Sequence, residues 1–181
     1  MANTQVTLVS PWAHDGDLSS FLEANTEASR SLLCLNVTQG LEFLHKKRVV
    51  HGDLKGVNVL VDSSHRAYLA DFGLSGFDDL EIVQWTTQSA EASKGGTVRY
   101  QAPELFPTEQ SLVFGMRYIR IPNSFLVGLD SYAKGKIFTD KVPFYATPDH
   151  FVAFQVIKGK RPTKPASPMP NGLLETLWTF M

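Results

Sequence analysis

Apolar residues recur at helical spacing in several stretches of the chain. The most regular stretch, residues 27–47, ends in basic residues that favour a helix C-terminus. Its apolar positions lie three or four residues apart: Leu33, Val37, Leu41 and Leu44. Asp17 begins a shorter pattern over residues 17–25 and can cap its first amides. Residues 149–160 and 173–181 also predict helices.

Short β-branched runs predict a small amount of sheet. Residues 59–62 and 67–70 flank a turn sequence at 63–66, which predicts a hairpin. Residues 6–10 predict a further strand, and residues 74–97, rich in serine, threonine, glycine and acidic residues, predict a long loop. The order of these elements predicts an α+β fold that is mainly helical and carries a few short strands.

Composition narrows the setting of the protein. The chain has 181 residues and a formal net charge of −1, which gives no electrostatic reason to expect nucleic acid or a membrane as partner. Its single cysteine, Cys34, lies in an apolar pattern and is expected in the core. We see no secretory signal and no apolar run of the ~20 residues that a membrane span needs. These features together favour a reducing, cytoplasmic location, and they leave the oligomeric state open.

A dense group of polar side chains lies between two β-branched runs. The segment HGDLKGVN at residues 51–58 brings together His51, Asp53, Lys55 and Asn58. Two shorter motifs follow, DFG at 71–73 and APE at 102–104. One interpretation is a hydrolytic metal site, although the sequence has no HExxH or similar spacing. Its ligands would be His51, Asp53, His65 and Asp71.

The three motifs, in this order and spacing, resemble the eukaryotic protein kinase family. The resemblance runs from about residue 5 to the end and implies a partial protein kinase domain over residues 1–181. Within it, residues 51–58 would form the catalytic loop and residues 71–104 the activation segment. The implied fold is the mainly helical C-terminal lobe of that family with its hinge, and the N-terminal lobe is expected to be absent.

The resemblance implies a phosphoryl-transfer site that uses ATP and Mg²⁺ as cofactors and a protein as substrate. Asp53 would orient the acceptor hydroxyl and take its proton, and Lys55 would stabilise the moving phosphoryl group. Asn58 and Asp71 would supply oxygen ligands to Mg²⁺. Leu60 would lie under the adenine ring.

The resemblance also gives structural roles to residues near that site. His51 would pack against Phe72, and Gly73 would permit the turn of the DFG motif. The remaining residues that match family positions are Thr97, Glu104 and Asp130. Lys55 and Thr97 favour serine/threonine specificity. The segments around the catalytic loop are similar to the tyrosine-kinase-like group of serine/threonine kinases.

The chain departs from the family pattern in two regions. It has no glycine-rich phosphate loop and no strand lysine of the VAIK type, so we expect the isolated chain to be inactive. Residues 105–135 are disturbed, because the approach to Asp130 is too long. The stretch after Asp130 is about five residues too short, which at about 1.5 Å per residue removes roughly 7 Å of helix.

Three hypotheses therefore remain open. The chain is part of a serine/threonine protein kinase, a non-catalytic pseudokinase-like binding module, or a mis-spliced gene-model fragment. The intact catalytic-loop residues favour ancestry in an active enzyme, whereas the missing lobe argues against activity of this chain alone.

Gly52 stands where most of the family has an arginine that pairs with phosphate on the activation segment. Candidate acceptors in this chain are Ser75, Thr86, Thr87, Ser89 and Ser93. We predict that their phosphorylation changes the phosphoryl-transfer rate only weakly, because the guanidinium partner is missing. Comparing phosphorylated with unphosphorylated full-length enzyme tests this prediction, and a large rate difference would contradict it.

Overall fold

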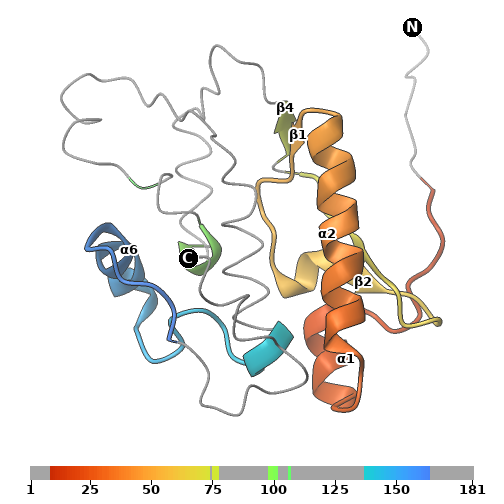
Figure 1. Cartoon of the computed structure of the whole chain (residues 1–181), viewed down its shortest axis with the longest axis horizontal. Helices are drawn as coiled ribbons and strands as arrows, with labels where there is room; N and C mark the ends of the chain where they lie inside the picture. Colours follow the sequence, from red (N-terminus) through yellow and green to blue (C-terminus); the bar gives the residue numbers. More distant parts are fainter. Residues whose placement is uncertain (1–8, 74, 78–97, 102–105, 107–136, 164–181) are drawn as a thin grey trace, which may run out of the picture.

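The structure is a computed structural model that describes residues 9–73, 75–77, 98–101, 106 and 137–163 (Figure 1). Its described elements are, in chain order, α1 (Leu18–Ala24), α2 (Arg30–Lys46), β1 (Val49–Val50), η1 (Gly56–Asn58), β2 (Val59–Val61), β3 (Ala67–Leu69), β4 (Gly76–Phe77), η2 (Val98–Tyr100) and α6 (Asp149–Ile157). Helices and short strands occur together, as the predicted α+β composition requires. None of the described helices is both long and apolar enough to cross a membrane.

Helix α1 begins where the sequence predicts, because Asp17 caps it. The backbone of Asp17 is extended, and its Oδ1 accepts hydrogen bonds from the amides of Ser19 at 2.9 Å and Ser20 at 3.1 Å. Burial raises the pKa of Asp17, but the hydrogen bond from the Ser20 hydroxyl, at 2.6 Å to Oδ2, together with these amide hydrogen bonds lowers the pKa below its ordinary value. At the other end, the Asn25 side chain donates to the Phe21 carbonyl at 2.9 Å, which ends the helix.

Helix α2 confirms the predicted long helix, although it begins at Arg30 rather than at residue 27. The predicted apolar positions are all buried: Leu33, Val37, Leu41 and Leu44. At its C-terminus, the amide of Lys47 donates to the carbonyls of Phe43 and Leu44, which uses two of the acceptors that a helix end leaves free. Burial of one apolar stripe therefore holds α2 against the rest of the molecule.

Strands β2 and β3 form the predicted hairpin. They pair antiparallel, with Val59 opposite Leu69 and Val61 opposite Ala67. Helix α2 covers this hairpin closely, since a Cβ added at Gly40 would lie 3.2 Å from the Leu69 side chain. The Asn36 side chain also accepts a hydrogen bond from the Ala67 amide at 3.2 Å. The hairpin is thus fixed to α2 by packing and by a polar contact.

A second, smaller sheet was not predicted. Strand β1 pairs antiparallel with β4, with Val49 opposite Phe77 and Val50 opposite Gly76. The prediction of loop for residues 74–97 is therefore wrong at its start, and the rest of that range lies outside the described residues. Of the strand predicted over 6–10, residues 9 and 10 are not in a strand, and residues 6–8 lie outside the description. The helix predicted over 173–181 also lies outside it.

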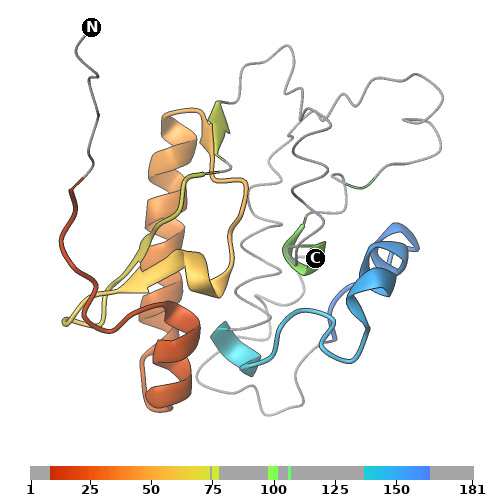
Figure 2. The same cartoon turned by 180° about the vertical axis from the view of Figure 1, so that it is seen from behind.

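Within the described residues, the core forms two clusters on different sides of the molecule (Figures 1 and 2). The larger cluster joins α1, α2, the hairpin and residues 137–138; it contains Leu18, Phe21, Leu22, Leu33, Val37, Leu41, Val59, Val61, Ala67, Ile137 and Phe138. The smaller cluster contains Phe106, Val152 and Val156 and lies under α6. Helix α6 itself confirms the predicted helix near residues 149–160.

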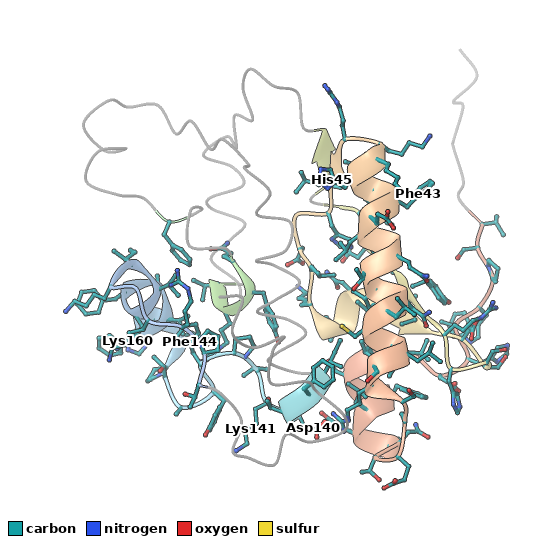
Figure 3. All side chains as sticks on the ribbon, in the orientation of Figure 1. Phe43, His45, Asp140, Lys141, Phe144 and Lys160 are labelled. Atoms are coloured by element: carbon teal, nitrogen blue, oxygen red, sulfur yellow. The ribbon has the colours of Figure 1, made fainter. Side chains whose placement is uncertain are left out.

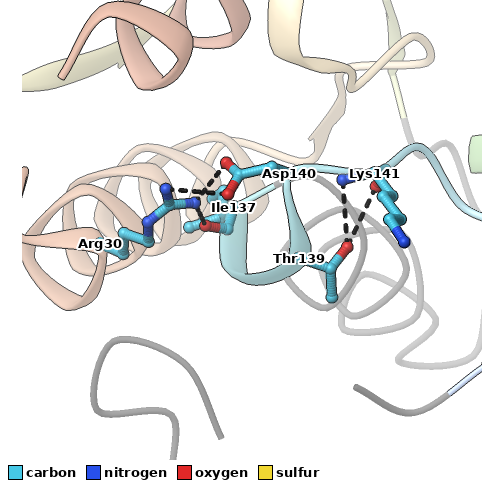
Figure 4. Close-up of polar contacts among 5 residues, drawn as sticks. All are labelled: Arg30, Ile137, Thr139, Asp140 and Lys141. Carbon is cyan, nitrogen blue, oxygen red and sulfur yellow. Dashed lines mark hydrogen bonds and ion pairs between the residues drawn. The ribbon is translucent and has the colours of Figure 1, made fainter. Parts of the chain in front are cut away.

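Arg30 connects the start of α2 to a distant short helical segment at residues 137–139 and to Asp140 after it (Figure 4). Its side chain is only 2% exposed. One terminal nitrogen donates to the Ile137 carbonyl and to Asp140 Oδ1 at 2.6 Å, and the other donates to Asp140 Oδ2 at 3.1 Å. A buried guanidinium with a two-pronged carboxylate partner fixes both distance and angle between the two segments.

We predict that Asp140→Asn lowers the free energy of unfolding by about 1–2 kcal/mol, because it removes the carboxylate charge that pairs with Arg30 among the described residues, from a position that is half exposed. Asparagine suits this position, since Asp140 has a φ of 57° that asparagine also tolerates. The matched control is Lys141→Gln at the exposed neighbouring residue, with an expected change within about 0.5 kcal/mol. Chemical denaturation measures both, and equal effects would contradict the assignment.

Candidate functional site

The predicted catalytic loop, residues 51–58, runs from the end of β1 to the start of β2. Helix α1 holds it from one side: Gly56 is buried, and a Cβ added there would lie 2.0 Å from Ser19 Oγ. Gly52 has a φ of 84°, in the left-handed region that glycine enters without strain. The two glycines therefore permit a close approach and a sharp bend, which aim the polar side chains between them.

Asp53 is the centre of a charged cluster in this loop. Its Oδ2 lies 2.7 Å from Lys55 Nζ and accepts a hydrogen bond from Asn58 Nδ2 at 3.0 Å. The same Asn58 nitrogen donates to the Asp53 carbonyl at 2.8 Å. The Asp53 side chain is 10% exposed and that of Lys55 is 27% exposed, so water screens the pair only in part. The structure thus brings together the three predicted residues Asp53, Lys55 and Asn58.

The second carboxylate oxygen of Asp53 has a different environment. Asp53 Oδ1 is buried and has no hydrogen-bond partner in the part of the chain that the structure describes. A buried carboxylate oxygen without a donor carries a desolvation cost that no described hydrogen bond offsets. A hydroxyl could reach this oxygen only after the groups that cover it move.

His51 anchors the loop to the end of β3. It is 2% exposed, its Nε2 lies 2.9 Å from the Ala70 carbonyl, and its Nδ1 lies 3.4 Å from the Asp53 amide. Nε2 therefore carries the proton and donates, while Nδ1 accepts, which describes a neutral ring. Burial lowers the pKa of His51, against the opposing effects of the Ala70 carbonyl and of the Asp53 and Asp71 charges.

The predicted contact between His51 and Phe72 is present. The ring centroids are 5.1 Å apart and the planes are tilted by 39°. The Ala70 amide donates to the Asn58 carbonyl at 2.9 Å, so the segment that leads into the DFG motif is bound directly to the catalytic loop. Two separate contacts therefore hold the two motifs side by side.

The turn of the DFG motif differs in detail from the prediction. The left-handed backbone is at Asp71, with a φ of 57°, and Gly73 is not among the residues with positive φ. Asp71 Oδ1 accepts a hydrogen bond from the Gly73 amide at 3.2 Å, and a Cβ at Gly73 would lie only 3.2 Å from the same oxygen. Glycine thus serves this turn by lacking a side chain that would crowd the Asp71 carboxylate.

Asn58 and Asp71, the two predicted metal ligands, carry oxygen donors of the kind that Mg²⁺ prefers. Within the described residues no group of three or more His, Cys, Asp or Glu could hold a metal ion. The alternative hydrolytic site is therefore wrong: both nitrogens of His51 are engaged, and His65 lies 3.7 Å from Asp15 instead. Asn58 and exposed Asp71 offer hard oxygens, which suit a Mg²⁺ ion that takes its other ligands from phosphates and water.

The remaining predicted residues are only partly described. Leu60 lies in β2, half-buried, opposite Tyr68 of β3. Three predicted residues lie outside the described ranges: Thr97, Glu104 and Asp130. The same holds for the disturbed segment 105–135 apart from Phe106, which is buried in the smaller core cluster.

Arg99 is an organising residue that sequence reasoning missed. Its Nε donates to Asp149 at 2.6 Å, and its terminal nitrogens donate to the carbonyls of Pro143 at 3.0 Å, Phe144 at 2.6 Å and Thr147 at 2.6 Å. The arginine lies a few residues before the APE motif, and it fixes that segment to the start of α6. Its main partners are backbone carbonyls, which leave no signal in a sequence.

Comparison with known proteins supports the family that the sequence motifs resemble. The family model described as "Protein kinase domain" matches residues 1–115. The serine/threonine/tyrosine-protein kinase HT1 of Arabidopsis thaliana is 29% identical over 181 residues, which cover 95% of this chain and 42% of that protein. The chain is also similar to the serine/threonine-protein kinase STY46 of Arabidopsis thaliana, at 30% identity over 81% of this chain and 23% of that protein.

A human protein is also similar. The receptor-interacting serine/threonine-protein kinase 1 of Homo sapiens is 31% identical over 62% of this chain and 19% of its own length. The chain spans less than half the length of each of these relatives.

We predict that the free energy of unfolding falls as the pH drops below about 6.5, the ordinary pKa of histidine. The unfolded chain then protonates His51 while the native ring stays neutral, so acid favours unfolding until the lowered native pKa is reached. The variant His51→Asn should be less stable at pH 8 and should lose this part of the pH dependence. The control His14→Gln, at an exposed histidine, should keep it, and an unchanged slope in His51→Asn would contradict the assignment.

Proposed function

Since the chain belongs to the protein kinase domain family, we propose that it carries the catalytic loop and Mg²⁺-binding motif of a serine/threonine protein kinase. The observation that carries the proposal is the arrangement around Asp53. One of its oxygens is held by Lys55 and Asn58, and the other is buried without a partner among the described residues. A general base needs a fixed orientation, which these contacts give the carboxylate, and an oxygen without a competing donor, which Oδ1 offers once the groups covering it move aside.

In the proposed reaction, the Asp53 carboxylate accepts the hydrogen bond of the acceptor hydroxyl and takes its proton, while the γ-phosphoryl group passes from ATP to the hydroxyl oxygen and ADP leaves. Such a group typically contributes ~10²–10⁴ in rate. Lys55 Nζ, already 2.7 Å from Asp53 Oδ2, places a cation where negative charge develops. Mg²⁺ and ATP, when bound, supply the phosphoryl group and neutralise its charge. Asn58 and Asp71 would hold the metal.

Asn58 is suited to that role because of its amide orientation. Its Nδ2 makes both hydrogen bonds to Asp53, so its oxygen is the end of the side chain that remains for a metal. The same contacts link metal binding to the position of the base.

Specificity for serine and threonine is part of the proposal. It rests on Lys55 within DLKGVN and on Thr97 by motif. The names of STY46 and of the receptor-interacting kinase agree with it, whereas that of HT1 includes tyrosine as well. Membership of the tyrosine-kinase-like group rests on the segments around the catalytic loop. A cytoplasmic location is proposed only on the sequence features given above.

We further propose that the chain corresponds to the C-terminal lobe. The sequence has no glycine-rich phosphate loop and no strand lysine of the VAIK type, which in this family hold the nucleotide phosphates. Tight binding of nucleotide would then need a further part of the protein. The same observation favours the second candidate, a non-catalytic binding module.

Asp71→Ala should abolish the thermal stabilisation by Mg-ATP of the longest natural protein that contains this chain. A ligand at 100 times its Kd stabilises by about 2.7 kcal/mol, which a thermal-shift titration detects. The control Asp53→Asn should keep the shift but lower the transfer rate by ~10²–10⁴.

The possible outcomes separate the two candidates. Loss of the shift in Asp71→Ala with retention in Asp53→Asn supports a kinase. Absence of any shift in the unsubstituted protein favours the binding module. An equal shift in Asp71→Ala would show that Asp71 does not hold the metal.

A further inference from the structure

Helix α6 has a buried face that belongs to the core. Val152 is 0% exposed and Val156 is 5% exposed, and both pack in the cluster with Phe106. Arg99 fixes the start of the helix through Asp149 and through the carbonyls of the preceding loop. The helix is therefore held firmly, and its outer face keeps a constant orientation.

That outer face is apolar as well. The side chains of Phe151, Phe154 and Ile157 are 52%, 51% and 53% exposed. Their spacing of three residues places them next to one another, on the side of the helix away from Val152 and Val156. We call these three residues the α6 stripe. Helices that are apolar on two opposite faces are usually covered by other protein or by a ligand on both faces. The exposed α6 stripe therefore indicates that a partner binds there.

The charges around the α6 stripe are positive. Lys158 Nζ lies 4.2 Å from the Phe154 ring centroid, and Lys160 and Arg161 follow directly. Two acidic residues described in this part of the chain are paired with arginines, Asp149 with Arg99 and Asp140 with Arg30, although both carboxylates remain about half exposed. Among the described residues, none of the ion pairs involves Lys158, Lys160 or Arg161. The stripe is therefore an apolar surface with a basic border.

We propose that the α6 stripe binds a short acidic, amphipathic peptide segment of a partner protein. Large apolar side chains of the peptide would cover Phe151, Phe154 and Ile157, and its carboxylates would pair with Lys158, Lys160 and Arg161. Charge complementarity is the reason for this choice of partner. A stripe held in place by Arg99 loses little freedom on binding, which favours affinity. The inference does not depend on catalysis.

The chain supplies a matched control surface on α2. Phe43 is 61% exposed, and Lys47, four residues later, lies 5.9 Å from its ring centroid. This is the same pair of residue types at the same helical spacing as Phe154 and Lys158. Figure 3 labels Phe43 on α2 and Lys160 near α6, on opposite sides of the molecule. The flank of this control surface is mixed in charge, because Glu42 pairs with Lys46 at 2.7 Å.

The probe is a fluorescein-labelled amphipathic peptide with three leucines at helical spacing and four glutamates, titrated with the whole chain in fluorescence anisotropy. We expect saturable binding that weakens at least ~10-fold in Phe154→Ala, the loss of one central anchor. Lys158→Glu should weaken peptide binding several-fold and should make the affinity less dependent on salt concentration. Phe43→Ala and Lys47→Glu should leave it within about 2-fold.

Several results would overturn the proposal. The proposal fails if the peptide shows no saturable binding at millimolar concentrations of the chain. It also fails if Phe43→Ala and Lys47→Glu weaken binding as much as the α6 variants do. A third contrary result is that a peptide with lysines in place of the glutamates binds as tightly as the acidic one. Self-association that Phe154→Ala abolishes would assign the stripe to a second copy instead. Binding to phosphatidylserine vesicles with no binding of the peptide would assign it to a lipid surface. Circular dichroism of Lys158→Glu, a change at the helix surface, confirms that the fold is retained.

Discussion

The site depends on the burial of one neutral histidine. His51 uses both ring nitrogens, one toward the end of β3 and one toward the loop that carries Asp53, and its ring face packs on Phe72. Two segments that are separate in sequence, the loop at 51–58 and the segment at 70–72, are thereby joined by a single side chain. Because burial keeps that ring uncharged, it holds the loop without adding a cation beside Lys55.

The core determines where that histidine lies. Helix α2 covers the β2–β3 hairpin, and the hairpin carries Asn58 at its start and Asp71 just beyond its end. Arg30 then ties the beginning of α2 to residues 137–140, and Arg99 ties the segment at 98–101 to α6. The largely buried guanidinium groups of Arg30 and Arg99 thus connect segments that are far apart in the sequence. Their hydrogen bonds fix the relative positions of these segments, which non-directional apolar packing does not do by itself.

The sequence predicts those features that repeat or that follow a motif. Leu33 to Leu44 repeat at helical spacing, and Asp17 is a typical cap, so α1 and α2 could be placed in advance. Strand β4 could not, because two residues carry no period. The cluster of Asp53, Lys55 and Asn58 followed from family motifs, but the buried Asp53 Oδ1 and the carbonyl partners of Arg99 depend on tertiary contacts. The positive φ at Asp71 is likewise a property of the assembled turn.

The approach of Gly56 to Ser19 has a consequence for how the protein can change. A methyl group at position 56 would meet Ser19 Oγ at 2.0 Å and Ser19 Cβ at 3.3 Å. The hydroxyl can rotate away, but the Cβ is fixed to helix α1. We therefore expect substitutions at the two positions to be non-additive, and a larger residue in the loop to be tolerated better once Ser19 has become smaller. The effect of a substitution at position 56 therefore depends on whether position 19 has already changed, so the order of the two mutations limits how this loop can evolve.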